Sequence, residues 1–299
     1  MDRLLHSGEF YSAACAFLWA AAVIYFRKGG DLVPPVVLNL FKNTVGFVLL
    51  VLSMLLVGVP FFPADRPPAD YLVLLGSGAC GIALADSLFF ASLNRLGAGR
   101  SAIVDCLYSP LVILCAFVYL GEPIGWTLIV AVVLIGSAIV IGTWEPATDA
   151  PPIARREWLL GVGYGVISMV LMSSAIVAAK PVITRSELWW ATTVRMAGAL
   201  PILLLLSATR RHRPAVRFAF TPGAHWKILM PGALLGAYFA LVLWILGFKY
   251  ASASVAGVLN QMSTIVVLLL ATPFLGEPLT RRKVIAIGLG FAGATLVVI

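Results

Sequence analysis

Ten continuous apolar stretches, each close to the length of a membrane-spanning helix, follow one another along the chain with short polar connections between them. A helix needs about 20 residues to cross roughly 30 Å of hydrocarbon. The stretches show none of the alternation of lipid-exposed barrel strands, and a helix satisfies its backbone groups internally. We therefore expect an all-α integral membrane protein of ten transmembrane helices, over residues 10–27, 33–58, 70–93, 99–120, 124–143, 158–179, 187–208, 226–248, 252–275 and 282–299.

The composition argues against a soluble fold. The chain is 61% hydrophobic and 11% charged, whereas soluble domains average about 45–50% and about 25%. The net charge of +8 would suggest nucleic acid in a soluble protein. Here the basic residues flank apolar stretches, as in membrane proteins. We expect a lipid bilayer as the surroundings and no nucleic-acid partner.

Nothing in the sequence points to a cofactor, a metal or ATP. The four cysteines lie inside apolar stretches without a C-x-x-C pair, and the three histidines lack the spacing of metal ligands. No phosphate-binding Gly-Lys loop is found. We expect no cofactor and no metal site.

A repeated sequence divides the chain into two halves. Leu120-Gly121-Glu122-Pro123 recurs 155 residues later as Leu275-Gly276-Glu277-Pro278, and the same offset places Asp105 on Asn260. Lys42 in the second stretch corresponds to Arg195 in the seventh. We predict two five-helix repeats, residues 1–145 and 146–299. An odd number of spans inverts the second repeat, an architecture common among secondary transporters.

Several of these residues resemble a known family. They are Trp19 midway along the first stretch, the cation in the second stretch of each half, and the Leu-Gly-Glu-Pro sequence that closes each fourth stretch. Together they resemble the drug/metabolite transporter superfamily, in its ten-helix EamA branch. The resemblance implies helices around a central cavity, and export or exchange of small metabolites, often amino acids, without ATP. Arg100-Ser101 stands where the aromatic amino-acid exporters of this branch carry a His-Gln pair.

Charged residues within the predicted spans are the first candidates for a site. A charge in hydrocarbon costs at least about 2.5–3.5 kcal/mol, so it usually faces a cavity or another protein group. Lys42 shares a helix face with Asn39, and that face can bind a carboxylate. Arg195 adds a planar fork suited to the same group. The alternatives are a lysine that reaches the interface and an internal ion pair of the arginine.

Two aspartates and their neighbours complete the polar candidates. Asp86 lies deep in the third stretch, where it can pair with Lys42 or Arg195, meet a substrate ammonium or carry a proton. Asp105 shares its helix with Tyr108, and its counterpart in the other half is the amide Asn260, beside Gln261. A titratable group thus occurs in one half where the other half has a neutral one.

Aromatic residues and turn glutamates have competing interpretations. Trp19, Tyr108, Tyr238 and Trp244 lie near the predicted middle of the membrane, where they can line a cavity or simply fill the packing. Glu122 and Glu277 sit in Gly-Glu-Pro turns at helix ends. We expect them to cap the first amides of the next helix.

The function predicted from these patterns is secondary transport. We expect a small zwitterionic or anionic metabolite, first a neutral amino acid, exported or exchanged across the inner membrane, with proton coupling through an aspartate. The alternatives are an organic-cation or drug transporter and, in another class, a membrane-embedded enzyme that modifies lipid. The oligomeric state stays open, and a monomer is compatible with the sequence.

The loop charges predict an orientation. Most basic residues follow odd-numbered stretches, which places those loops in the cytoplasm and both termini outside by the positive-inside rule. The family resemblance implies cytoplasmic termini instead. Following the charges, we predict that a reporter enzyme active only in the periplasm is active when fused after Ile299. An inactive reporter on a well-expressed fusion would contradict this orientation.

Overall fold

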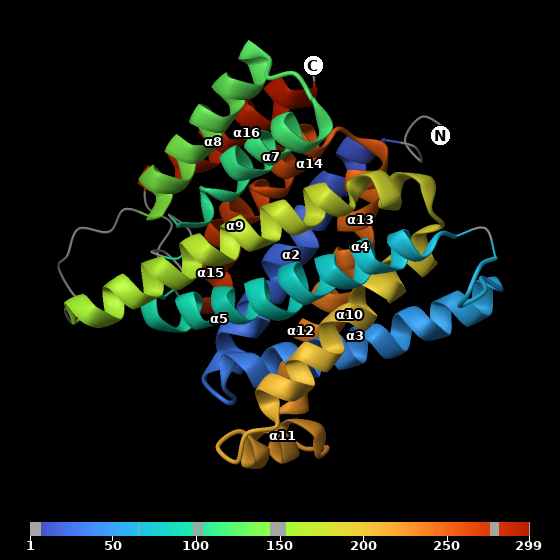
Figure 1. Ribbon diagram of the computed structural model, residues 1–299. Helices are drawn as coiled ribbons and strands as arrows, with labels where there is room; N and C mark the ends of the chain where they lie inside the picture. Colours follow the sequence, from blue (N-terminus) through green and yellow to red (C-terminus); the bar gives the residue numbers. More distant parts are fainter. Residues whose placement is uncertain are drawn as a thin grey trace.

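The computed structural model describes residues 7–64, 66–97, 101, 104–143, 154–275 and 281–298, which form helices joined by loops and contain no strand (Figure 1). In the first half the helices lie close to the predicted stretches. They are α2 (Gly8–Gly30), α3 (Pro35–Val57), α4 (Pro68–Gly78), a π-helical turn η1 (Ala79–Leu84), α5 (Ala85–Leu96), α7 (Tyr108–Leu120) and α8 (Trp126–Thr143).

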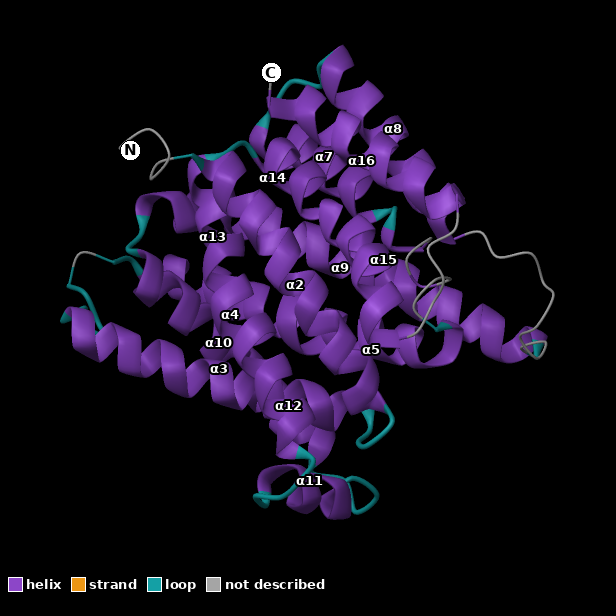
Figure 2. Cartoon of the chain, turned by 180° about the vertical axis from the view of Figure 1, so that it is seen from behind, coloured by secondary structure: helices purple, strands orange, loops and turns teal. Residues whose placement is uncertain are grey.

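The second half repeats this order, with two further short helices among the described residues, α11 and α14. Its elements are α9 (Arg155–Arg185), α10 (Leu188–Ser207), α11 (Arg213–Phe220), α12 (Trp226–Ala233), the π-helical turn η2 (Leu234–Ala240), α13 (Leu241–Tyr250), α14 (Ala253–Asn260), α15 (Met262–Leu275) and α16 (Arg281–Val298). The sequence patterns do not predict α11, which lies at one end of the bundle (Figures 1 and 2). Near the other end α2 begins and α16 ends.

Length and composition identify six helices in the described residues that can cross a membrane. They are Gly8–Gly30, Pro35–Val57, Pro68–Leu96, Arg155–Arg185, Leu188–Ser207 and Trp226–Tyr250. The apolar helices Tyr108–Leu120, Trp126–Ile141, Ala253–Val267 and Val284–Leu296 are shorter. The all-helical membrane fold is confirmed, whereas the count of ten spans stays a prediction.

Local irregularities recur at the offset seen in the sequence. The π-helical turn η1 begins at Ala79, and η2 begins 155 residues later at Leu234. A turn at Cys106 and Leu107 precedes α7, and a turn at Gln261 precedes α15 at the same offset. Because π-helical turns are rare and concentrate at functional sites, their recurrence argues that the two halves share one five-helix plan.

The halves pack against each other reciprocally. Helix α3 of the first half contacts η2 of the second, and α10 of the second contacts η1 of the first. Glycines allow close approach at both places: a Cβ added to Gly46 would lie 2.5 Å from the carbonyl oxygen of Ala237 in η2, and one added to Gly198 would lie 2.2 Å from that of Leu75 in α4, one turn before η1. Each π-helical turn is therefore held by a helix of the other repeat.

Glu122 links the halves at one end of the bundle. Its carboxylate accepts hydrogen bonds from the backbone N–H of Ala253 at 2.8 Å and of Ser254 at 3.1 Å, and from the Ser254 hydroxyl at 2.8 Å. The expected capping role is confirmed, but the helix capped is α14 of the second half rather than the next helix along the chain. Glu277 lies outside the described residues.

Lys180 binds the turn between α13 and α14, next to the amides that Glu122 caps. Its ammonium group donates to the carbonyl oxygens of Phe248 at 2.6 Å and Ala251 at 2.5 Å, where α13 ends. The turn between α13 and α14 is thus held by an anion on its amides and a cation on its carbonyls, which complements the charges at helix ends.

The cap predicts a stability effect. We expect Glu122→Ala to lower the free energy of unfolding by about 1–2 kcal/mol, because the first amides of α14 lose their acceptors. Thermal unfolding in detergent measures this. Glu157→Ala is the control, since Glu157 forms only a half-exposed ion pair with Arg95 at 3.2 Å, typically worth under about 1 kcal/mol. Equal effects of the two substitutions would contradict the assignment.

Candidate functional site

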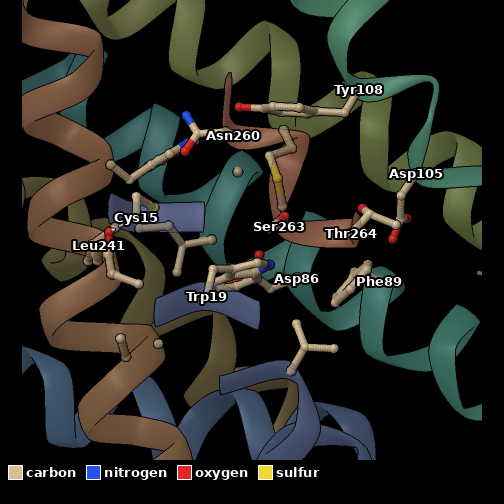
Figure 3. Close-up of a pocket in the computed structure, with 18 of the residues that line it drawn as sticks. Cys15, Trp19, Asp86, Phe89, Asp105, Tyr108, Leu241, Asn260, Ser263 and Thr264 are labelled. Atoms are coloured by element: carbon tan, nitrogen blue, oxygen red, sulfur yellow. Dashed lines mark hydrogen bonds between the residues drawn. The ribbon is translucent and has the colours of Figure 1, made fainter. Parts of the chain in front are cut away.

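A cavity opens between the halves, with about 1170 Å³ of empty space including the part open to solvent. Both halves contribute to the wall (Figure 3). In this view Tyr108 and Asn260 lie above the cavity, with Trp19 and Asp86 below. Nine of the predicted residues line it: Trp19, Lys42, Asp86, Asp105, Tyr108, Arg195, Trp244, Asn260 and Gln261.

Lys42 and Asp86 form a buried ion pair in this wall. The ammonium nitrogen lies 2.6 Å from Asp86 Oδ2, and the two side chains are 4% and 8% exposed. The rings of Trp19, Phe26 and Phe90 surround the ammonium at 5.5–5.9 Å from their centroids. Each charge is therefore compensated inside the protein, and neither is free to attract a ligand strongly.

Arg195 is compensated much less. Its Nε donates to the Ser77 hydroxyl at 2.8 Å, and its guanidinium lies 4.9 Å from the ring centroid of Trp244. The two terminal nitrogens, Nη1 and Nη2, are buried and form no hydrogen bond with any described residue. The carboxylate of Asp86 is bound to Lys42 and forms no ion pair with Arg195. A buried guanidinium with two free nitrogens has the chemistry to bind an anion.

The repeat explains why Arg195 lacks a counter-ion. The offset of 155 residues that relates the halves places Leu241 at the position of Asp86, and both residues line the cavity. In the first half the cation of the second span meets a carboxylate of the third. In the second half the corresponding arginine has no such carboxylate in its own repeat. Lys42 and Arg195 thus occupy matching positions in the two halves, but only Lys42 is neutralised by a carboxylate of a described residue.

Asp105 supplies an unpaired carboxylate. It lines the cavity on the side opposite Leu241 in the view of Figure 3. Its Oδ1 is buried, and the side chain forms no hydrogen bond or ion pair with any residue that the structure describes. Its counterpart Asn260 donates to the carbonyl oxygen of Ala256 at 2.8 Å, and the Asn260 Oδ1 is free.

The helix break next to Asn260 brings further polar groups to the cavity. Gln261 Nε2 donates to the Thr264 hydroxyl at 3.3 Å, and Ser109 donates to Gln261 Oε1 at 3.5 Å. Met169, Met172, Phe89 and Leu93 form apolar parts of the wall. Sequence reasoning missed these four apolar residues because nothing distinguishes them from ordinary packing residues before the fold is known.

Two predicted residues lie away from the cavity. Asn39 is fully buried, and its Nδ2 donates to the carbonyl oxygens of Ile82 and Ala83 at 2.9 and 3.2 Å. It satisfies backbone groups that the π-helical turn η1 frees, so packing explains its position. The Tyr238 hydroxyl bonds that of Ser53 at 2.6 Å, and its ring stacks on Trp189. Neither residue lines the cavity.

Comparisons with known proteins agree with this architecture. The chain is 26% identical to Protein PecM of Dickeya dadantii over 263 residues, covering 79% of this chain and 84% of that protein. It is 27% identical to a probable terminal-alkyne amino-acid exporter of Streptantibioticus cattleyicolor over 289 residues, covering 93% and 89%.

The fold is also found among solved structures. One crystal structure aligns with a TM-score of 0.75 over 98% of each chain, at 19% identity, which shows a shared fold alone. The sequence model of the EamA-like transporter family matches twice, over residues 6–144 and 159–299. The two-repeat architecture predicted from the sequence is confirmed by this double match. This multi-pass membrane protein belongs to the EamA-like transporter family.

Proposed function

We propose that the protein is a secondary transporter that exports a neutral amino acid, or a zwitterion of similar size, across the inner membrane. The free guanidinium nitrogens of Arg195 in the cavity are the observation that carries this proposal. A relative that is 27% identical is named as a probable amino-acid exporter, which supports the same substrate class.

The substrate carboxylate binds Arg195. Two free, buried guanidinium nitrogens match the two oxygens of a carboxylate, and such bidentate pairs are strong and directional. Because burying an unpaired charge is costly, a ligand that neutralises the guanidinium gains more here than it would at the surface. Lys42 does not compete for the carboxylate, since Asp86 already neutralises it.

The substrate ammonium group, or a proton, binds Asp105. This carboxylate is unpaired and lines the same cavity as Arg195. A group that can accept either a proton or a substrate ammonium couples the two, because only one of them occupies it at a time. The Lys42–Asp86 pair then maintains the shape of the cavity rather than exchanging ions.

An organic-cation substrate fits less well. Recognition of such cations relies on open aromatic faces. In this cavity Lys42 lies 5.9 Å from the ring centroid of Trp19, and Arg195 lies 4.9 Å from that of Trp244. Both rings therefore already meet a cation of the protein, and a second one would be repelled.

Transport assays on two substitutions test the carboxylate site. Arg195→Gln removes the charged fork, and we expect uptake of neutral amino acids by proteoliposomes to fall tenfold to a hundredfold, the equivalent of about 1.5–3 kcal/mol. Leu241→Asp restores the carboxylate that the first half carries at the matching position. We expect it to reduce transport as strongly, because the new carboxylate competes with the substrate for Arg195.

Leu241→Asn is the matched control for this pair, because it has nearly the same size as the aspartate without the charge. It should transport several times faster than Leu241→Asp. Unchanged transport by Arg195→Gln, in protein that unfolds at the wild-type temperature, would contradict the proposal.

The coupling of transport to a proton gradient is tested by substituting Asp105. We expect Asp105→Asn to abolish transport driven by an imposed pH gradient, by at least tenfold, because an amide cannot take up the proton. The unfolding temperature should stay the same or rise, since the buried carboxylate has no partner to lose. Asp31→Asn, at an exposed carboxylate paired with Arg27, is the control. Normal gradient-driven transport by Asp105→Asn would exclude this residue.

A further inference from the structure

The connection between α10 and α12 is strongly basic. It carries Arg210, Arg211, Arg213 and Arg217, and Lys227 follows at the start of α12. Residues 188–276 contain no aspartate or glutamate, so no acidic neighbour in sequence balances these charges. All five side chains are exposed, and none forms an ion pair with a residue that the structure describes.

The position of this connection is fixed by the helices that flank it. Leu188–Ser207 and Trp226–Tyr250 are both long and apolar enough to cross a membrane. The segment that joins them must therefore return along the membrane surface. Helix α11 lies there, beyond the ends of α10 and α12 (Figures 1 and 2).

Specific contacts hold α11 against the bundle. Ala219 is buried, and its carbonyl oxygen accepts a hydrogen bond from Trp226 Nε1 at 2.9 Å. The ring of Phe220 meets that of Phe41 on α3 with 5.3 Å between centroids. The helix is thus a packed element, and its basic side chains project from a defined surface.

Two aromatic rings accompany the charges. Phe218 and Phe220 remain 43% and 37% exposed, although water disfavours exposed phenyl rings. Phe218 also stacks on His225, with ring centroids 4.1 Å apart. Short helices with arginines beside exposed phenylalanines are typical of segments that lie in the interface of a bilayer.

We propose that α11 and its flanking loop form a binding surface for anionic phospholipid headgroups. The guanidinium groups pair with the phosphate oxygens, and the phenyl rings insert at the level of the acyl chain boundary. Nucleic acid or an acidic protein would leave the rings in water. An anionic leaflet attracts juxtamembrane basic segments in general, and here the packed helix concentrates them at one place. The proposal is independent of the transported substrate.

The test measures lipid-specific stabilisation of the full-length protein purified in a mild detergent. We expect added phosphatidylglycerol to raise the unfolding temperature by several degrees more than phosphatidylcholine does. In the double variant Arg211→Gln/Arg217→Gln, the difference between the shifts caused by the two lipids should fall by at least half. The number of phosphatidylglycerol molecules retained, counted by intact mass measurement, should fall about twofold as well. That count does not depend on the stability of the variant.

The matched control is Arg155→Gln/Arg156→Gln, which removes two exposed cations at the start of α9 and should keep the wild-type response. Equal losses in both variants, or equal effects of the two lipids on the wild type, would overturn the proposal. Soluble glycerol phosphate carries the charge of the headgroup but no acyl chains. It therefore tests binding of the charge without insertion into the membrane. We expect it to give no shift, and a shift equal to that of phosphatidylglycerol would overturn the lipid assignment.

Discussion

The cost of placing ions in hydrocarbon governs the centre of this protein. Four charged side chains line the cavity, and each must find a partner or remain uncompensated. Lys42 and Asp86 neutralise each other at 2.6 Å, whereas Arg195 and Asp105 have no such partner in the described part of the chain. A buried pair that loses one member is strongly destabilised. The pair is therefore best suited to a structural role, and the two unpaired groups to a ligand.

Duplication supplies the scaffold, and the differences between the copies supply the site. The π-helical turns and the helix breaks recur at one offset, so the backbone plan is common to both halves. The copies diverge at two positions in the cavity wall: Asp86 corresponds to Leu241, and Asp105 corresponds to Asn260. Had an aspartate stood at position 241 as well, each cation could meet a carboxylate of its own repeat. Divergence leaves one free positive and one free negative group on a shared cavity, the charge pattern of a zwitterion.

The sequence predicts the helices and the charged cavity residues because hydrophobic length and buried charge are local properties. It leaves open which cation pairs with Asp86, since that depends on how the third span rotates against the second. The role of Asn39 depends on the η1 turn, which has no sequence signature. Helix α11 was not predicted because its eight residues are too few for an apolar stretch. The target of Glu122 required knowing that the halves meet there.

The ends and the centre of the bundle differ in how easily their polar contacts can exchange. Glu122 and Lys180 are half-buried and bind backbone groups at the α13–α14 turn. Water can replace such bonds, and each contributes about 0.5–1.5 kcal/mol net, or about 1.5–3 kcal/mol when charged. Separating Lys42 from Asp86 would leave two ions in hydrocarbon at a far higher cost. Breaking contacts at the ends of the helices therefore costs less than separating the buried pair, which is compatible with alternating access around a fixed central site.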